Sequence, residues 1–130
     1  MKQDRGAVLL ITVLIVSAIS ASIASSLILI GTDNLQISNN FSDSAKAKAL
    51  VDSCAETALA RIKTDNAITG NYNTNINGQT CSYNIINTSG QNRTIQVLAT
   101  VNSSTKRLQI NINQITPQII VNNWQQINNF

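Results

Sequence analysis

One short segment brings together side chains that could in principle carry out chemistry. Residues 51–59 read VDSCAETAL and contain Asp52, Cys54, Glu56 and Thr57. A cysteine among such groups suggests a nucleophilic thiol, but that thiol would need a base to activate it, usually a histidine. The chain contains no histidine, which also removes the commonest metal ligand. The segment therefore indicates a structural cysteine, and we expect no enzyme activity, metal site or cofactor.

The chain has two cysteines, Cys54 and Cys81, and their state depends on the compartment they occupy. In a reducing cytosol both would usually stay free thiols, whereas in an exported protein a disulfide is the default. Cys54 falls on an apolar helical stripe, and Cys81 opens a segment of alternating apolar residues. If these two faces pack together, the two sulfur atoms meet and a disulfide is expected.

The stretch that decides the compartment is residues 7–30, AVLLITVLIVSAISASIASSLILI, which contains no charge, proline or glycine. As a helix it would be about 36 Å long, enough to cross a hydrocarbon layer of about 30 Å. Its polar side chains are small hydroxyls, which can bond to a carbonyl one turn back and are common where membrane helices meet. A short polar head with two basic residues precedes it and ends in Gly6.

Three interpretations of residues 1–30 are compatible with these features. An ordinary secretory signal would be removed, and the small-x-small sequence at 22–24 offers a cleavage site, although the apolar run continues well past it. An uncleaved anchor would keep its N-terminus in the cytoplasm through Lys2 and Arg5. The third interpretation is a leader that is cut directly after Gly6.

The third interpretation rests on a resemblance to a known family. The short basic head, Gly6 at the junction, the small residue Ala7 and the long apolar run resemble the class III leader of type IV pilins and pseudopilins. The resemblance implies that a prepilin peptidase cuts between Gly6 and Ala7 on the cytoplasmic side and N-methylates Ala7. It also implies that the apolar helix is retained, first as a membrane anchor and later in the core of a filament.

The chain departs from this family at Ile11, the fifth residue after the implied cleavage site, where most members have glutamate. That glutamate is thought to pair with the N-terminal amine of a neighbouring subunit during assembly. Its absence is known mainly among minor subunits with similar openings, so the resemblance implies a minor or tip-proximal subunit. An apolar Ile11 costs nothing in lipid, whereas a glutamate there would need a partner.

Beyond the apolar run, residues 31–64 predict an amphipathic helix. Apolar and small residues recur at three- and four-residue spacing, and Arg61 and Lys63 suit a C-terminal turn. The predicted apolar stripe comprises Ile37, Phe41, Ala47, Leu50, Val51, Cys54, Ala58 and Ile62. Gly31 leaves two possibilities open: one helix continuous from Ala7, or an anchor followed by a separate helix.

Residues 65–80 predict a loop between the helix and a sheet. The segment is rich in Asn, Thr and Gly, and its few apolar anchors are Ile68, Tyr72 and Ile76. In pilins the corresponding connection is a variable surface loop, so the resemblance implies a contact surface here.

Residues 81–130 predict a small antiparallel sheet with one apolar face. Period-two segments occur at 81–86, 94–101 and 106–115, and a last, poorly patterned edge strand is expected at 119–127. Pairing Val101 with Lys106 places apolar residues opposite one another on one face. The expected pairs are Ala99 with Leu108, Val97 with Ile110, and Ile95 with Ile112.

The charge pattern does not favour nucleic-acid binding. The net charge is only +3, and after Asp65 the charged residues are Arg93, Lys106 and Arg107. In the expected hairpin Arg93 lies opposite Gln114, about 26 Å from the other two cations. We therefore expect a solvated, weakly basic surface.

Together these features predict an α+β fold, in which a long N-terminal helix packs on a small antiparallel sheet. The resemblance divides the chain into a leader (1–6), an assembly half (7–30), an amphipathic half (31–64), a loop (65–80) and a sheet (81–130). It implies a structural subunit of a type IV pilus or pseudopilus, with other pilin subunits and prepilin peptidase as partners. The subunit would reside in the cytoplasmic membrane with its N-terminus inside, and then in an extracellular filament or at the cell surface. The alternative is a membrane-anchored or secreted surface-binding module that does not polymerise.

Overall fold

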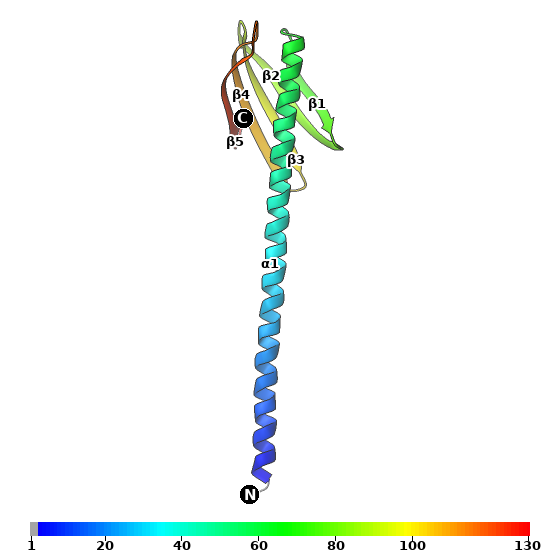
Figure 1. Ribbon diagram of the computed structural model, residues 1–130, viewed down its shortest axis with the longest axis vertical. Helices are drawn as coiled ribbons and strands as arrows, with labels where there is room; N and C mark the ends of the chain where they lie inside the picture. Colours follow the sequence, from blue (N-terminus) through cyan, green and yellow to red (C-terminus); the bar gives the residue numbers. More distant parts are fainter. Residues whose placement is uncertain (1–2) are drawn as a thin grey trace. The chain divides into compact units, whose positions relative to one another are not determined.

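The computed structural model describes residues 3–130, with side chains from Arg5 onward, so Met1 and Lys2 of the expected leader lie outside the described residues. The architecture is α+β, as predicted: one long helix and a five-stranded antiparallel sheet (Figure 1). The elements are α1 (Gln3–Thr64), β1 (Gly70–Ile76), β2 (Gln79–Ser89), β3 (Asn92–Val101), β4 (Ser104–Gln114) and β5 (Ile120–Ile127). The strands lie side by side in sequence order, so β1 and β5 form the two edges.

Helix α1 passes through Gly31 without interruption. A side chain at Gly31 would meet no atom within 4 Å, so the local packing does not require glycine at this position. The two possibilities left by the sequence are thereby resolved in favour of one continuous helix. The chain divides into two compact units within α1: unit 1 extends to Asn39, and unit 2 comprises Asn40–Phe130.

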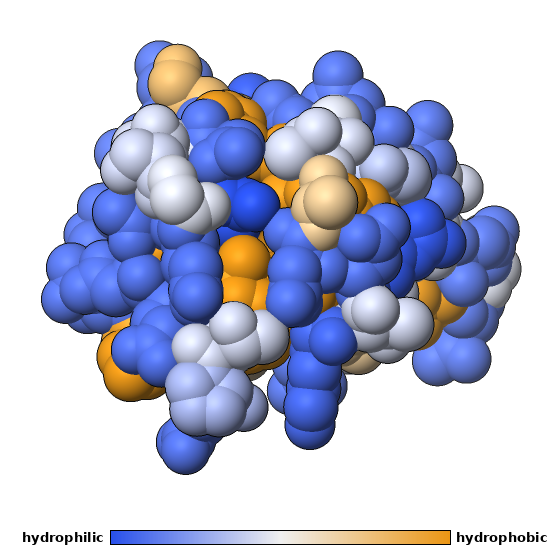
Figure 2. Space-filling view, turned by 90° about the horizontal axis from the view of Figure 1, so that it is seen from above, coloured by the Kyte–Doolittle hydropathy of each residue, from blue (hydrophilic) through white to orange (hydrophobic). Residues whose placement is uncertain are grey.

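The core of unit 2 lies between one stripe of α1 and one face of the sheet. The buried helix residues are Ala47, Leu50, Val51, Cys54, Ala55, Ala58 and Ile62, and the buried strand residues include Tyr83, Ile85, Ile95, Val97, Leu108, Ile110 and Ile112. The alternating burial along β3 and β4 is the pattern expected of a sheet covered on one side. Seen from above, the molecular surface is mainly hydrophilic with a few apolar areas (Figure 2).

The predicted apolar stripe on the helix is confirmed only from Ala47 onward. Ile37 and Phe41 are exposed, Phe41 by 77%. The reason lies in the length of the sheet, since the β3–β4 turn reaches α1 near Asp43, where Asn102 Nδ2 donates a 3.0 Å hydrogen bond to Asp43 Oδ2. Helical spacing places a residue on a face, but the opposing strands decide which residues of that face are covered.

The prediction of a loop at 65–80 was wrong for most of that segment. Residues 70–76 form β1, and β2 begins at Gln79. The turn between the two strands is Asn77-Gly78, and both residues have positive φ, 53° and 81°. An Asn-Gly pair is a strong signal for a two-residue hairpin turn, because both residues tolerate this backbone conformation. The predicted anchors Ile68, Tyr72 and Ile76 do pack against the core.

The predicted β3–β4 register was wrong by two residues. Val101 pairs with Ser104 instead of Lys106, and Val97 therefore pairs with Leu108. The chain turns in two residues at Asn102, whose φ of 51° asparagine accepts more readily than most residues. A shift of two residues leaves every side chain on the same face, so the predicted apolar face is retained.

Candidate functional site

The implied processing site lies in the first turns of α1. Gly6, Ala7 and Ile11 are all helical and exposed. A side chain at Gly6 would meet no atom within 4 Å, although glycine inside a helix costs about 1 kcal/mol relative to alanine. The packing of the described residues therefore gives no reason for glycine at position 6.

Among the described residues, the large side chains in the apolar part of α1 in unit 1 are exposed. Its large side chains from Val8 to Ile30 are between 53% and 68% exposed. The helix contains a segment long and apolar enough to cross a membrane. So continuous an apolar surface needs lipid or other apolar helices around it, because exposing it to water is unfavourable in proportion to its area.

The polar side chains of this segment are satisfied within the helix itself. Each hydroxyl donates to a carbonyl oxygen three or four residues earlier, at 2.8 to 2.9 Å. The residues concerned are Thr12, Ser17, Ser20, Ser22, Ser25 and Ser26. Because no hydroxyl proton is left without an acceptor, the segment can enter hydrocarbon at little polar cost.

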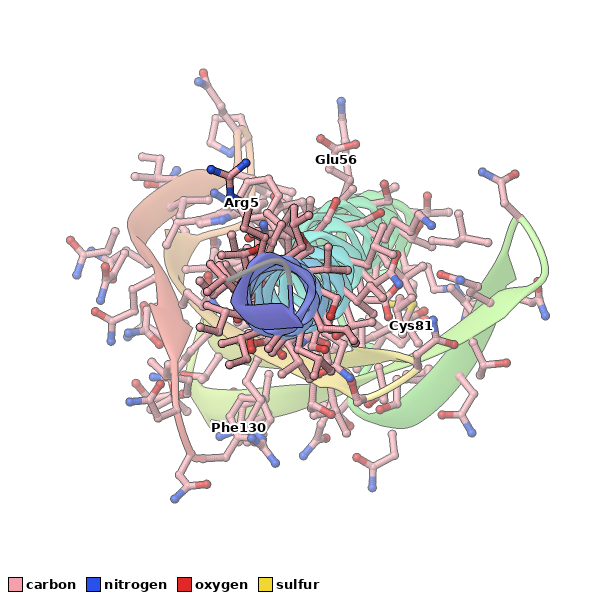
Figure 3. The ribbon with its side chains drawn as sticks, turned by 90° about the horizontal axis from the view of Figure 1, so that it is seen from below. Arg5, Glu56, Cys81 and Phe130 are labelled. Atoms are coloured by element: carbon pink, nitrogen blue, oxygen red, sulfur yellow. A yellow bond between two sulfur atoms is a disulfide. The ribbon has the colours of Figure 1, made fainter. Side chains whose placement is uncertain are left out.

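Cys54 and Cys81 form a disulfide, as expected from the sequence. Cys54 lies on the buried face of α1 and Cys81 near the start of β2, with their Cα atoms 6.4 Å apart. The two residues are 0% and 2% exposed, and Figure 3 shows Cys81 reaching toward the helix from the sheet. The disulfide joins α1 to β2, the strand that pairs with the edge strand β1. Strand β1 lies within the chain segment between the two cysteines.

An aromatic cluster lies beside the end of the helix. The rings of Tyr72 and Tyr83 are stacked with centroids 5.5 Å apart, and the Arg61 guanidinium lies 5.2 Å from the first ring and 5.9 Å from the second. Burial raises the pKa of Tyr83 above its ordinary value of 10.0, and the positive charge of Arg61 opposes that rise. The Tyr83 hydroxyl is buried with no hydrogen-bond partner among the described residues, so this cluster holds β1 and β2 against α1 mainly by apolar and cation–π contact.

Arg93 was expected on a solvated basic surface, and that expectation was wrong. Its side chain is 6% exposed. Nη1 donates to Asn87 Oδ1 at 2.8 Å, to Gly90 O at 2.8 Å and to Asn92 O at 2.9 Å. Nη2 donates to Asn66 O at 2.8 Å. The guanidinium therefore ties the segment after α1 to the β2–β3 turn.

Residue type alone did not reveal the role of Arg93. Arg93 pairs with the buried Ile112, where the predicted register had placed it opposite Gln114. Arginine is rarely buried unless its donors are satisfied. Here Nη1 and Nη2 find acceptors in separate turns, whereas Nε has no hydrogen-bond partner among the described residues. The other two late cations remain partly exposed, so the three do not form one basic patch.

The described residues contain no group of three or more metal-ligating side chains. Comparison of the chain with protein-family models, with curated proteins and with solved structures gave no match.

Proposed function

We propose that this chain is a membrane-anchored subunit of a type IV pilus or pseudopilus-like filament and occupies a minor position in it. The observation that carries the proposal is the uncovered apolar part of α1, which continues without a break into a disulfide-bonded domain. Before assembly, lipid covers the apolar side chains. After assembly, the corresponding helices of neighbouring subunits take the place of lipid.

Gly6 supports processing by a prepilin peptidase. The described packing does not require glycine there, and glycine weakens a helix. A requirement of an external enzyme, which must fit the backbone at the cleavage point, explains the residue. Cleavage after Gly6 leaves Ala7 as an N-methylated first residue at the start of the apolar run.

Ile11 supports a minor position. An apolar side chain there cannot pair with the N-terminal amine of a neighbouring subunit, so a filament made only of this chain would lack that contact. We therefore expect purified filaments to contain a small fraction of this chain. Its deletion should reduce the number of filaments more than their length. Filaments composed mostly of this chain would overturn the minor position.

A second candidate is a membrane-anchored surface-binding module that does not polymerise. It is favoured by the internal hydrogen bonds of the hydroxyls in the anchor, since lipid alone can then surround the helix. This candidate predicts an intact N-terminus, or one produced by ordinary signal peptidase.

The mature N-terminus separates the candidates. The full chain is expressed with a prepilin peptidase, and the N-terminal peptide is analysed by mass spectrometry. We expect a chain that begins with N-methylated Ala7. Gly6→Leu should block this cleavage, whereas Gly31→Leu, a matched change at another helical glycine with free space around it, should leave it intact. A mature chain beginning at Ser25, or no cleavage of the unmodified protein, contradicts the filament proposal.

A further inference from the structure

The face of the sheet that points away from α1, here called the outer face, carries almost no charge. Side chains alternate between the two faces along each strand, so the residues between the buried ones belong to the outer face. The charged residues of the described strands are Arg93, Lys106 and Arg107. The first two lie opposite buried residues, and only Arg107 lies on the outer face. A partner of this face must therefore be recognised by neutral groups.

Five side-chain amides cross the outer face in one row, one from each strand. The register brings them together because opposed residues of an antiparallel pair share a face of the sheet. The members of this amide row, from β1 to β5, are Asn71, Asn84, Gln96, Gln109 and Gln125. Neighbouring strands lie about 4.8 Å apart, so the row is about 19 Å long.

The fold uses few of the hydrogen-bonding groups in the amide row. All five residues are at least partly exposed. Within the described part of the chain, only one of the five side chains makes a hydrogen bond, since Gln109 Nε2 donates to Asn111 Oδ1 at 3.4 Å. Each amide has two N–H donors and an oxygen acceptor. The row therefore offers regularly spaced donors and acceptors to an external partner.

One half of the amide row borders a hollow in the outer face. Asn71, Asn84 and Gln96 line this hollow, which has a volume of about 340 Å³, within the size range of ligand pockets. Leu98 and Phe130 add apolar surface to it. Phe130 is 53% exposed, and Figure 3 shows it across the sheet from the helix. The hollow thus combines an exposed aromatic ring with amides.

We propose that the outer face binds a neutral, extended glycan that lies along the amide row, with one sugar ring in the hollow. Sugar hydroxyls both donate and accept hydrogen bonds, as side-chain amides do, so this recognition needs no charge. The C–H face of a sugar ring is apolar and can stack on the ring of Phe130. Sheet faces bind oligosaccharides in other folds. Because the site lies wholly within unit 2, the proposal does not depend on whether the chain enters a filament.

Two other occupants fit the outer face less well. A nucleic acid is held mainly by cations against its phosphates, and the one cation of this face, Arg107, donates through Nη1 to Asn128 O at 3.0 Å. The centre of a protein interface is usually apolar and rich in aromatic residues. The centre of this face is instead formed by the amides of Gln96 and Gln109. The surface therefore matches a neutral, hydrogen-bonding partner best.

Titration of the full chain with soluble glycans tests the proposal. The probes are cellohexaose, mannohexaose and chitohexaose, and the detergent must have no sugar headgroup. We expect at least one probe to bind with an affinity that salt leaves unchanged, because no ion pair is formed. Absence of binding by all three at millimolar concentration would overturn the proposal. Loss of binding at high salt, or tighter binding of double-stranded DNA, would also overturn it, since either result indicates an anionic partner.

Paired variants test the location of the site. The double variant Asn84→Ala, Gln96→Ala removes two amides from the hollow and should weaken binding about tenfold or more. The matched control Asn113→Ala, Gln126→Ala removes the same two residue types outside the amide row, the second of them opposite the buried Leu108, and should bind normally. Phe130→Ala should also weaken binding, whereas Phe130→Tyr should retain it. Thermal unfolding checks that each variant folds. Equal affinities of the two double variants would contradict the proposed site.

Discussion

Removal of the Cys54–Cys81 disulfide should destabilise unit 2 by an amount that the structure allows us to work out. The bond joins residues 27 apart in sequence. Closing a loop of that length in the unfolded chain corresponds to about 3.5 kcal/mol in the chain-entropy description. Both cysteines are buried, so the double variant Cys54→Ala, Cys81→Ala also leaves small cavities and adds to the loss.

This loss corresponds to a large change in melting temperature. Unit 2 has about 90 residues, and for domains of that size each kcal/mol shifts Tm by about 4 to 8 °C. We therefore expect a decrease of roughly 20 °C. Native domains have stabilities of only about 5 to 15 kcal/mol, so the double variant should lose a large part of its stability at growth temperature. The segment containing β1, which lies within the disulfide-closed loop, should become accessible to proteases first.

The assay should report on the sheet alone, because the long helix dominates circular dichroism. Fluorescence of Trp124 on β5 provides such a probe in the full chain in detergent. Ser53→Ala, an exposed change next to the bridge, is the matched control and should leave Tm unchanged. A decrease of less than about 5 °C would refute the chain-entropy reasoning. Two thiols that alkylate freely in protein from the cell surface would refute the bridge itself.

Three further changes in unit 2 have expected outcomes. Arg93→Met should lower the free energy of unfolding by about 3 kcal/mol in chemical denaturation, because it leaves buried acceptors without donors; an unchanged value would contradict this. Burial raises the pKa of Tyr83 above 10.0, so the folded state retains a proton that the unfolded state releases, and stability should fall as pH rises past 10. Tyr83→Phe should abolish that fall in alkaline denaturation, whereas Tyr72→Phe should retain it. Asn102→Val should cost about 2 kcal/mol in thermal unfolding, because it strains a positive φ and removes the bond to Asp43, and Asn102→Gly should cost less.

Alternation predicted the faces of the strands but not their register. Ile95 and Val97 are buried as expected, because period two assigns each side chain to a face regardless of its neighbours. The same period makes registers that differ by two residues equivalent in apolar pairing. Turn geometry decides between them, and the positive φ of Asn102 selects the shorter turn.

The first strand was missed because composition was given more weight than turn chemistry. Residues 70–76 are polar, but Tyr72, Thr74 and Ile76 alternate with asparagines and are partly buried. An edge strand that packs over only part of the core needs few apolar residues. The Asn77-Gly78 pair was the available signal, since it predicts a hairpin whatever the composition of its flanking strands.

Burial of Arg93 could not be predicted from its local sequence. Its acceptors are side-chain and backbone oxygens brought together by the end of α1 and the β2–β3 turn, one of them 27 residues away. Sequence patterns report local periodicity, whereas the satisfaction of a buried guanidinium depends on contacts that exist only after folding.

The two units divide the work of the chain between separate kinds of surface. The buried core begins at Ala47, whereas the large apolar side chains described in unit 1 are exposed. Residues of the core are in turn constrained by packing density and by the disulfide, where small changes in volume are costly.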